Sequence, residues 1–257
     1  MGKRESMRTA LLAAPDREAY LLAGSNLPGP RANLELLDAA GDVLAREEAL
    51  RLAALGPADA PAGTALEFLP CCGVVAIGRL VVEGDPGLVA LLRGAAGDPR
   101  WRVRESVAIA LQRWGDADVG AMTAAIASWP DGTLLEARAA VAAICEPRLL
   151  RTPVAVQAAS RILDGATRSL VAIPRPRGEP GRVLGAALGY GWSVAIAASP
   201  EAVLPAFERW AASDDPDVRR LVRENLGKAR FTRAAPEAVA RLAALVARRD
   251  RQGGRTR

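Results

Sequence analysis

Apolar residues recur along the chain at the three- and four-residue spacing of amphipathic helices. Ala and Leu, which favour helix, dominate the composition, and the alternating pattern of half-buried strands is largely missing. Proline or an acidic residue precedes many of the apolar runs, as in Pro200-Glu201 and Pro236-Glu237, and both residue types mark the first turn of a helix. The pattern predicts an all-α protein of about a dozen helices of ordinary length.

A pattern of one helix, an Asp-Pro turn and a second helix occurs twice. Its turns are Asp98-Pro99 and Asp215-Pro216, and a Val-Arg pair follows each turn. A further helix is expected before each turn, over residues 88–96 and 203–212. One such pair cannot bury both of its apolar faces, whereas a stack of pairs can. The repeat therefore predicts an α-solenoid, a superhelix of antiparallel helix pairs.

The placement of irregular stretches suggests a simple domain organisation. We expect an N-terminal tail over residues 1–14, one solenoid domain over residues 15–248, and a basic, disordered tail over residues 249–257. The Pro- and Gly-rich stretch 173–181 is interpreted as a loop between helices. The uncharged stretch from Val183 to Pro200 approaches the length of a membrane span, but its small residues favour a buried helix, so no membrane association is expected.

The residue types present exclude several kinds of chemistry. The chain has no histidine, which rules out Ser-His-Asp and Cys-His catalysis and imidazole metal ligands. Cys71, Cys72 and Cys145 lack the spacing of a zinc site or a disulfide framework and are interpreted as core residues of a cytoplasmic protein. No phosphate loop or dinucleotide fingerprint occurs. We expect neither a cofactor nor a metal, and a monomer.

The net charge is concentrated at the C-terminal end. The chain carries a formal charge of +5, and the stretch from Ser213 onward has twelve Arg and Lys residues against six Asp and Glu. A basic end of this kind indicates an anionic partner such as nucleic acid. A solvated, arginine-rich surface would have the same composition and remains the alternative.

The helix expected to begin at Val218 places its arginines to one side. At about 100° per residue, Arg219, Arg223 and Arg230 form a stripe beside the apolar face, with Arg220 just beyond it. A row of guanidinium groups along a helix edge can follow a phosphate backbone with bidentate contacts. This stripe is therefore a candidate nucleic-acid contact.

Aromatic residues accompany the arginines elsewhere in the chain. Trp101, Arg102 and Arg104 lie together at the start of the helix after the first Asp-Pro turn, and an indole ring can stack on a base. Tyr190 and Trp192 lie in the Gly-rich helix and are expected either to face a groove or to fill the core. The alternative for each tryptophan is a structural role, in which its side chain fills space between packed helices.

The second copy, residues 215–227, resembles the HEAT repeat, with Asp-Pro-x-Val-Arg followed by small residues and Leu-Gly. The resemblance covers only the two copies, and Arg223 and Asn225 stand at usually small positions. It implies the solenoid fold for the chain. It also implies a second role for Arg104 and Arg219, since HEAT repeats commonly use such arginines, with the Asp of the turn, to tie turn to helix.

A narrower resemblance links the chain to DNA repair. Trp101-x-x-Arg104 and Val222-Arg223-Glu224 are similar to segments of the bacterial alkylpurine DNA glycosylases built from HEAT-like repeats. That family binds duplex DNA in a basic concave groove and excises alkylated purines. In its second segment an aromatic residue stands where this chain has Arg220. Its catalytic Asp has no counterpart here, and Glu67 is the carboxylate nearest the matching position.

Three functions follow from these features. The first is a nucleic-acid-binding repeat protein in which Trp101, Tyr190 and Trp192 line a groove and the arginines hold phosphates, namely Arg102, Arg104, Arg219, Arg220, Arg223 and Arg230. The second is a protein-interaction scaffold, the commonest use of such repeats. The third is an active DNA glycosylase that uses Glu67.

Overall fold

The computed structural model describes residues 2–253. Within this range the chain forms fourteen α-helices and three short 3-10 segments, and no strand. The all-α prediction is confirmed. The chain divides into two compact units, Met1–Asp118 (unit 1) and Val119–Arg257 (unit 2). No Pro- or Gly-rich linker marks this boundary, because it lies within the helical run Trp101–Ile126, at a residue where the backbone leaves helical geometry (Asp118, φ −151°, ψ 93°).

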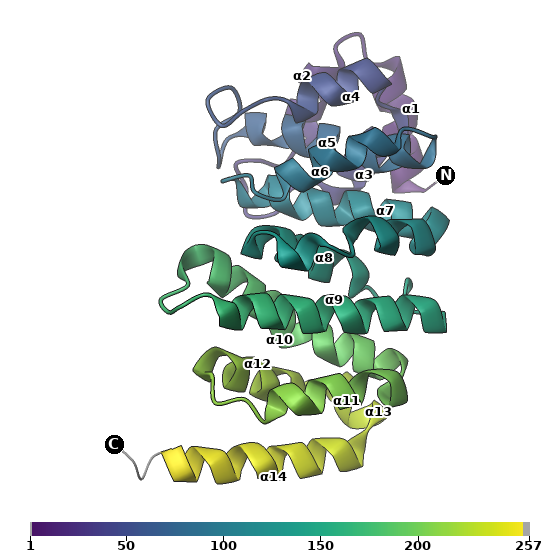
Figure 1. The fold of residues 1–257 in the computed structure, drawn as a ribbon. Coiled ribbons are helices and arrows are strands. Elements are labelled where there is room, and N and C mark those ends of the chain that lie inside the picture. Colours follow the sequence, from purple (N-terminus) through teal and green to yellow (C-terminus); the bar gives the residue numbers. More distant parts are fainter. Residues whose placement is uncertain (1, 254–257) are drawn as a thin grey trace. The chain divides into compact units, whose positions relative to one another are not determined.

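Unit 1 contains six helices and the first part of a seventh (Figure 1, purple to teal). They are α1 (Lys3–Ala13), α2 (Arg17–Gly24), α3 (Leu34–Val43), α4 (Arg46–Ala53), α5 (Phe68–Val82), α6 (Val89–Ala95) and α7 (Trp101–Ile126) up to Asp118. Two 3-10 segments, η1 (Ala65–Glu67) and η2 (Pro86–Leu88), precede α5 and α6.

Helix α5 is the centre of unit 1. It packs against α2, α3, α4 and α6, and nearly all of its side chains are buried. Glycines allow close crossings: a Cβ added at Gly73 would collide with the backbone of Ala53, and one at Gly78 with the backbone of Ala110. Within the described residues, Ala65–Val82 is the one helical stretch long and apolar enough to cross a membrane, but 78% of it is buried inside the protein, as in a core helix.

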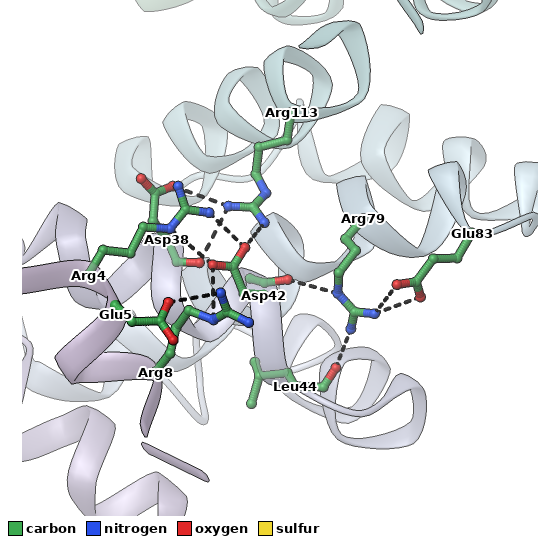
Figure 2. A network of polar contacts seen from close by, with 10 residues as sticks. Arg4, Glu5, Arg8, Asp38, Asp42, Leu44, Arg79, Glu83 and Arg113 are labelled. Atoms are coloured by element: carbon green, nitrogen blue, oxygen red, sulfur yellow. Dashed lines mark hydrogen bonds and ion pairs between the residues drawn. The ribbon is translucent and has the colours of Figure 1, made fainter. Parts of the chain in front are cut away.

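Helix α1 is attached to α3 mainly through ion pairs (Figure 2). Asp42 on α3 accepts hydrogen bonds from Arg4 Nη2 at 2.7 Å and from Nη2 of Arg113 on α7, and Arg8 Nε lies 3.6 Å from it. Burial alone would raise the pKa of Asp42, but the guanidinium groups of Arg4 and Arg113 hold it below its usual value. Residues 1–14, which the sequence analysis assigns to a tail, thus contain a docked helix.

Unit 2 contains the rest of α7 and seven further helices (Figure 1, green to yellow). They are α8 (Leu134–Ile144), α9 (Pro153–Ala172), α10 (Gly178–Ala198), α11 (Pro200–Ala211), α12 (Pro216–Leu226), α13 (Ala229–Ala234) and α14 (Pro236–Gly253). The short segment η3 (Trp129–Asp131) precedes α8. The expected basic tail over 249–257 begins inside α14, and residues 254–257 lie outside the described residues.

Helix α10 is the centre of unit 2. It packs against α8, α9, α11, α12 and α13, and it contains the uncharged stretch predicted to form a buried helix. Asn225 of α12 is fully buried against it: Nδ2 donates to Leu188 O at 2.8 Å, and Oδ1 accepts from Ser193 N at 2.8 Å. The buried amide of Asn225 is therefore satisfied by backbone groups of α10, which joins α12 to this helix.

A helix lies on each side of both Asp-Pro turns, α6 and α7 at the first and α11 and α12 at the second. In the second copy Asp215 caps α12, where its Oδ1 accepts from Asp217 N at 2.9 Å and Val218 N at 3.3 Å. In the first copy Asp98 Oδ1 accepts from Arg100 N at 2.7 Å. The Asp-Pro dipeptides thus begin both helices, as the sequence predicts.

Candidate nucleic-acid interface

Trp101 and Arg102 open α7 in unit 1. The Trp101 ring is half exposed, and the Arg102 guanidinium lies over it with Cζ 4.5 Å from the ring centroid. Arg102 turns its donors inward: Nη1 donates to Glu67 Oε2 at 3.1 Å and Nη2 to Gly29 O at 3.2 Å. Trp101 is therefore available to a ligand, whereas Arg102 is engaged with groups of its own unit.

Arg104 does not reach the surface. Only 7% of the residue is exposed, and its Nη1 donates to Asp98 O at 2.8 Å and Pro99 O at 3.2 Å. This position corrects the expectation that Arg104 holds a phosphate. It ties the helix to the turn through backbone carbonyls, because Arg100 takes the carboxylate of Asp98 at 2.7 Å.

Glu67, the candidate catalytic carboxylate, is fully buried. Its Oε2 accepts from Gly63 N at 2.9 Å as well as from Arg102, and its Oε1 has no partner among the described residues. A general base must lie within hydrogen-bond reach of its substrate. Enclosed in this way, Glu67 stabilises the loop before α5 and the position of Arg102, and it does not present a base to a bound nucleotide.

In unit 2, one strip of α10 stays accessible and carries Tyr190. The side chain is partly buried, and its hydroxyl donates to Cys145 O at 3.2 Å. Burial raises the pKa of Tyr190 to about 12, nearby Cys145 and Glu146 add to the rise, and the positive charges of Arg230 and Arg138 oppose it. The charges of Arg230 on α13 and Arg138 on α8 thus act on this hydroxyl, as does the carboxylate of Glu146.

Arg220 reaches α10 from α12. Its Nη2 lies 3.1 Å from the position that a Cβ on Gly185 would occupy, so the guanidinium rests against this helix. Arg182 lies eight residues before Tyr190, and both belong to the accessible strip of α10, whereas Gly185 is buried and lies about 140° around the helix from Tyr190. We call Arg138, Arg182, Tyr190, Arg220 and Arg230 together the α10 basic face.

The ion pairs of Arg220 leave its donors accessible. The guanidinium lies 3.7 Å from Asp217 Oδ1 and 3.8 Å from Glu224 Oε1, and its side chain is 49% exposed. Exposed pairs at such distances contribute about 0–1 kcal/mol. An incoming phosphate can therefore replace these carboxylates at little cost.

The other predicted residues of α12 differ in their surroundings. Arg219 is half buried, and no partner for its side chain occurs among the described residues. Arg223 is exposed and has a contact of its own. The sequence pattern did not single out Arg138 and Arg182; Arg182 lies eight residues, about two helical turns, before Tyr190, and this spacing is a signal that would have found it.

Trp192 lies in the core of unit 2. It is fully buried, its Nε1 donates to Thr167 Oγ1 at 3.2 Å, and its ring packs against Phe207 at a centroid distance of 5.6 Å. This position corrects the expectation that Trp192 lines a groove. Trp192 and Tyr190 are only two residues apart in the chain, but on a helix their side chains point about 200° apart.

The three cysteines are buried and free, as expected for core residues. Burial raises the pKa of Cys71 to about 12, and it also raises those of Cys72 and Cys145 well above the usual value of a thiol. The thiols therefore stay protonated near neutral pH. Among the described residues, no cluster of His, Cys, Asp and Glu has an arrangement that could hold a metal ion.

The chain matches no protein-family model, and no curated protein is similar to it in sequence.

Proposed function

We propose that this protein binds nucleic acid through the α10 basic face of unit 2. The observation that carries the proposal is the accessible strip of α10 with Arg182 and Tyr190, together with Arg220 of α12 against the same helix at Gly185 and the charges of Arg138 and Arg230 acting on the Tyr190 hydroxyl. Phosphate contacts from such a face position a nucleic acid without reading its sequence. Arg182, Arg220 and Arg230 contact phosphates, and the Tyr190 ring packs against a sugar or base.

The proposal extends to the architecture. The two copies of helix, Asp-Pro turn and helix support a HEAT-like solenoid, in which successive helix pairs stack. The proposal includes no base excision, because the glycosylase Asp has no counterpart in the chain and the carboxylate of Glu67 is buried against Arg102.

Salt dependence of binding is the direct test. Fluorescence anisotropy would follow labelled duplex DNA, single-stranded DNA and single-stranded RNA between about 50 and 200 mM salt. We expect affinity to fall steeply with salt for at least one of these polymers. The triple variant R182A/R220A/R230A should lower the slope of log K against log salt by up to about 2 to 3, according to the polymer.

The matched control removes the same charge elsewhere in unit 2. Arg161, Arg168 and Arg209 lie exposed on α9 and α11, and R161A/R168A/R209A should leave most of the binding intact. Equal losses in the two triple variants, or binding that is insensitive to salt, would contradict the proposal. A partner protein retained at high salt would favour the scaffold function instead.

A further inference from the structure

Unit 1 contains a pocket that the proposed function does not use. It has a volume of about 340 Å³ and lies where the loop before α3 meets the first turns of α3, α5 and α7. Small-molecule sites in proteins begin at about 300 Å³ and are lined mainly by apolar side chains. Its apolar walls come from Leu34, Leu37, Phe68, Trp101 and Ile109.

Two large apolar side chains at this pocket are exposed to solvent. Leu34 is 60% exposed and Trp101 is 50% exposed, although they belong to different helices. A ligand between them would remove apolar surface from water on both sides, at about 25 cal/mol per Å². The Arg102 guanidinium supports one face of the Trp101 ring and fixes its orientation.

The charge in the pocket lining that has no partner of opposite sign among the described residues is positive. Arg31 in the lining is exposed, and no acidic partner for it occurs among the described residues. Arg102 is paired with Glu67, but its buried Nε has no acceptor in the described part of the chain. Glu105, the carboxylate of the lining, already has a contact of its own. An anionic group is therefore the charge that complements the site.

The remaining polar groups of the pocket favour binding over chemistry. The Ser106 hydroxyl donates to Arg102 O at 2.9 Å, and burial raises the pKa of the Cys71 thiol to about 12. A protonated thiol is a poor nucleophile. Neither group is activated to attack a ligand.

We propose that this pocket binds a small molecule with a flat apolar body and a single carboxylate. The apolar body lies between Trp101 and Leu34, and the carboxylate pairs with Arg31. The site consists of unit 1 residues only, so the inference stands or falls independently of nucleic-acid binding by unit 2.

Three probes that share an apolar body and differ in charge test this proposal. Naphthalene carboxylate, naphthol and naphthyl methylamine would be titrated into the full-length protein and followed by calorimetry. In parallel, the indole N–H signal of Trp101, assigned with Trp101→Phe, would be followed by nuclear magnetic resonance. We expect the carboxylate to bind about tenfold more tightly than the amine and to move the Trp101 signal, with naphthol between them.

Two exposed positions provide the variants, so that folding is preserved. Arg31→Gln should reduce carboxylate affinity to that of naphthol without changing naphthol binding. Leu34→Glu should weaken the carboxylate further by placing a negative charge at the rim. Arg51→Gln, which removes an exposed arginine of α4, should change neither. Absence of carboxylate binding at millimolar concentration, tighter binding of the amine, or indifference to both pocket variants would overturn the proposal.

Discussion

The central helices of the two units differ in how completely neighbouring helices bury them. Helix α5 is buried around nearly its whole circumference, whereas α10 keeps one strip open along Arg182, Ala186 and Tyr190. Unit 1 directs Arg102 and Arg104 inward and leaves an apolar pocket beside its core. Unit 2 leaves its arginines around the open strip. The part of the central helix that neighbouring helices leave open therefore determines which surface of each unit is accessible to a ligand.

The two Asp-Pro turns show the same contrast at residue level. Asp98 is held by Arg100, two residues away, and Asp215 by Arg177, which lies in the loop before α10. Arg100 Nη1 and Nη2 also donate to Ala60 O at 3.0 Å and Leu55 O at 2.9 Å. The two Asp-Pro turns are thus alike in sequence, but a neighbouring arginine holds the first and an arginine far away in the chain holds the second.

Removal of Arg100, the buried arginine at the first Asp-Pro turn, should lower the free energy of unfolding more than any other variant proposed for this comparison. Arg100 is 3% exposed, and Arg100→Met would leave the Asp98 carboxylate and several carbonyls without their donor. We expect a loss of about 3–5 kcal/mol in the free energy of unfolding. Arg177→Met should cost less, about 1–3 kcal/mol, because within the described residues Arg177 donates to a single backbone carbonyl, that of Ile173, and Asp215 keeps two backbone amide donors. Urea denaturation followed by circular dichroism measures both.

The surface pair of Arg51 with Glu18 supplies the reference for these losses. Both side chains are exposed, and Arg51→Met should change stability by less than about 1 kcal/mol. If Arg100→Met were no more destabilising than Arg51→Met, the turn of unit 1 would not depend on its arginine, and the contrast between the turns would fail.

Glycine substitutions sharpen the comparison of the central helices. In Gly78→Ala the new Cβ would meet backbone atoms of Ala110, which cannot move without shifting α7. We expect a loss of about 1–3 kcal/mol or more. In Gly189→Ala the Cβ would meet the carboxylate end of Glu224, a flexible side chain that can turn away, so the loss should be smaller. Thermal or urea unfolding of the two variants decides the order, and a greater loss at Gly189 would contradict it.

Acid should weaken the docking of α1 in unit 1. The pKa of Asp42 is lowered in the folded protein, so its stabilising contribution is complete above the usual Asp value of 3.8 and is lost as the pH falls through the folded pKa. Asp42→Asn should cost about 1–3 kcal/mol at neutral pH and progressively less below that value. Urea midpoints across this range, with exposed Glu47→Gln as control, measure the effect.

The pKa of Asp215 in unit 2 is lowered in the same way: hydrogen bonds from Arg177 and from backbone amides outweigh the effect of burial. Asp215→Asn should therefore remove a second part of the acid sensitivity, and the double variant should be less sensitive than either single one. Parallel acid profiles for Asp42→Asn and the unmodified protein would show that the α1 network does not respond to pH.

Local signals of the sequence predicted the helices well and the partners of their side chains poorly. The Asp-Pro dipeptides predicted two helix starts, since a cap acts within a few residues. The spacing of arginines on the second repeat helix did not reveal that Arg220 rests on α10 while Arg219 lacks a side-chain partner among the described residues. Those outcomes depend on which neighbouring helix is close enough to supply an acceptor.

The sequence by itself determined the all-helical fold, the two helix–turn–helix copies and the absence of histidine chemistry, because propensity, capping and composition are local properties. Only the tertiary structure decided that Arg104 and Trp192 are buried, that Tyr190 lies on an accessible strip of α10, and that unit 1 holds a pocket. Burial depends on contacts between residues far apart in the chain, and the same arginine is a structural tie or a surface cation according to what packs against it.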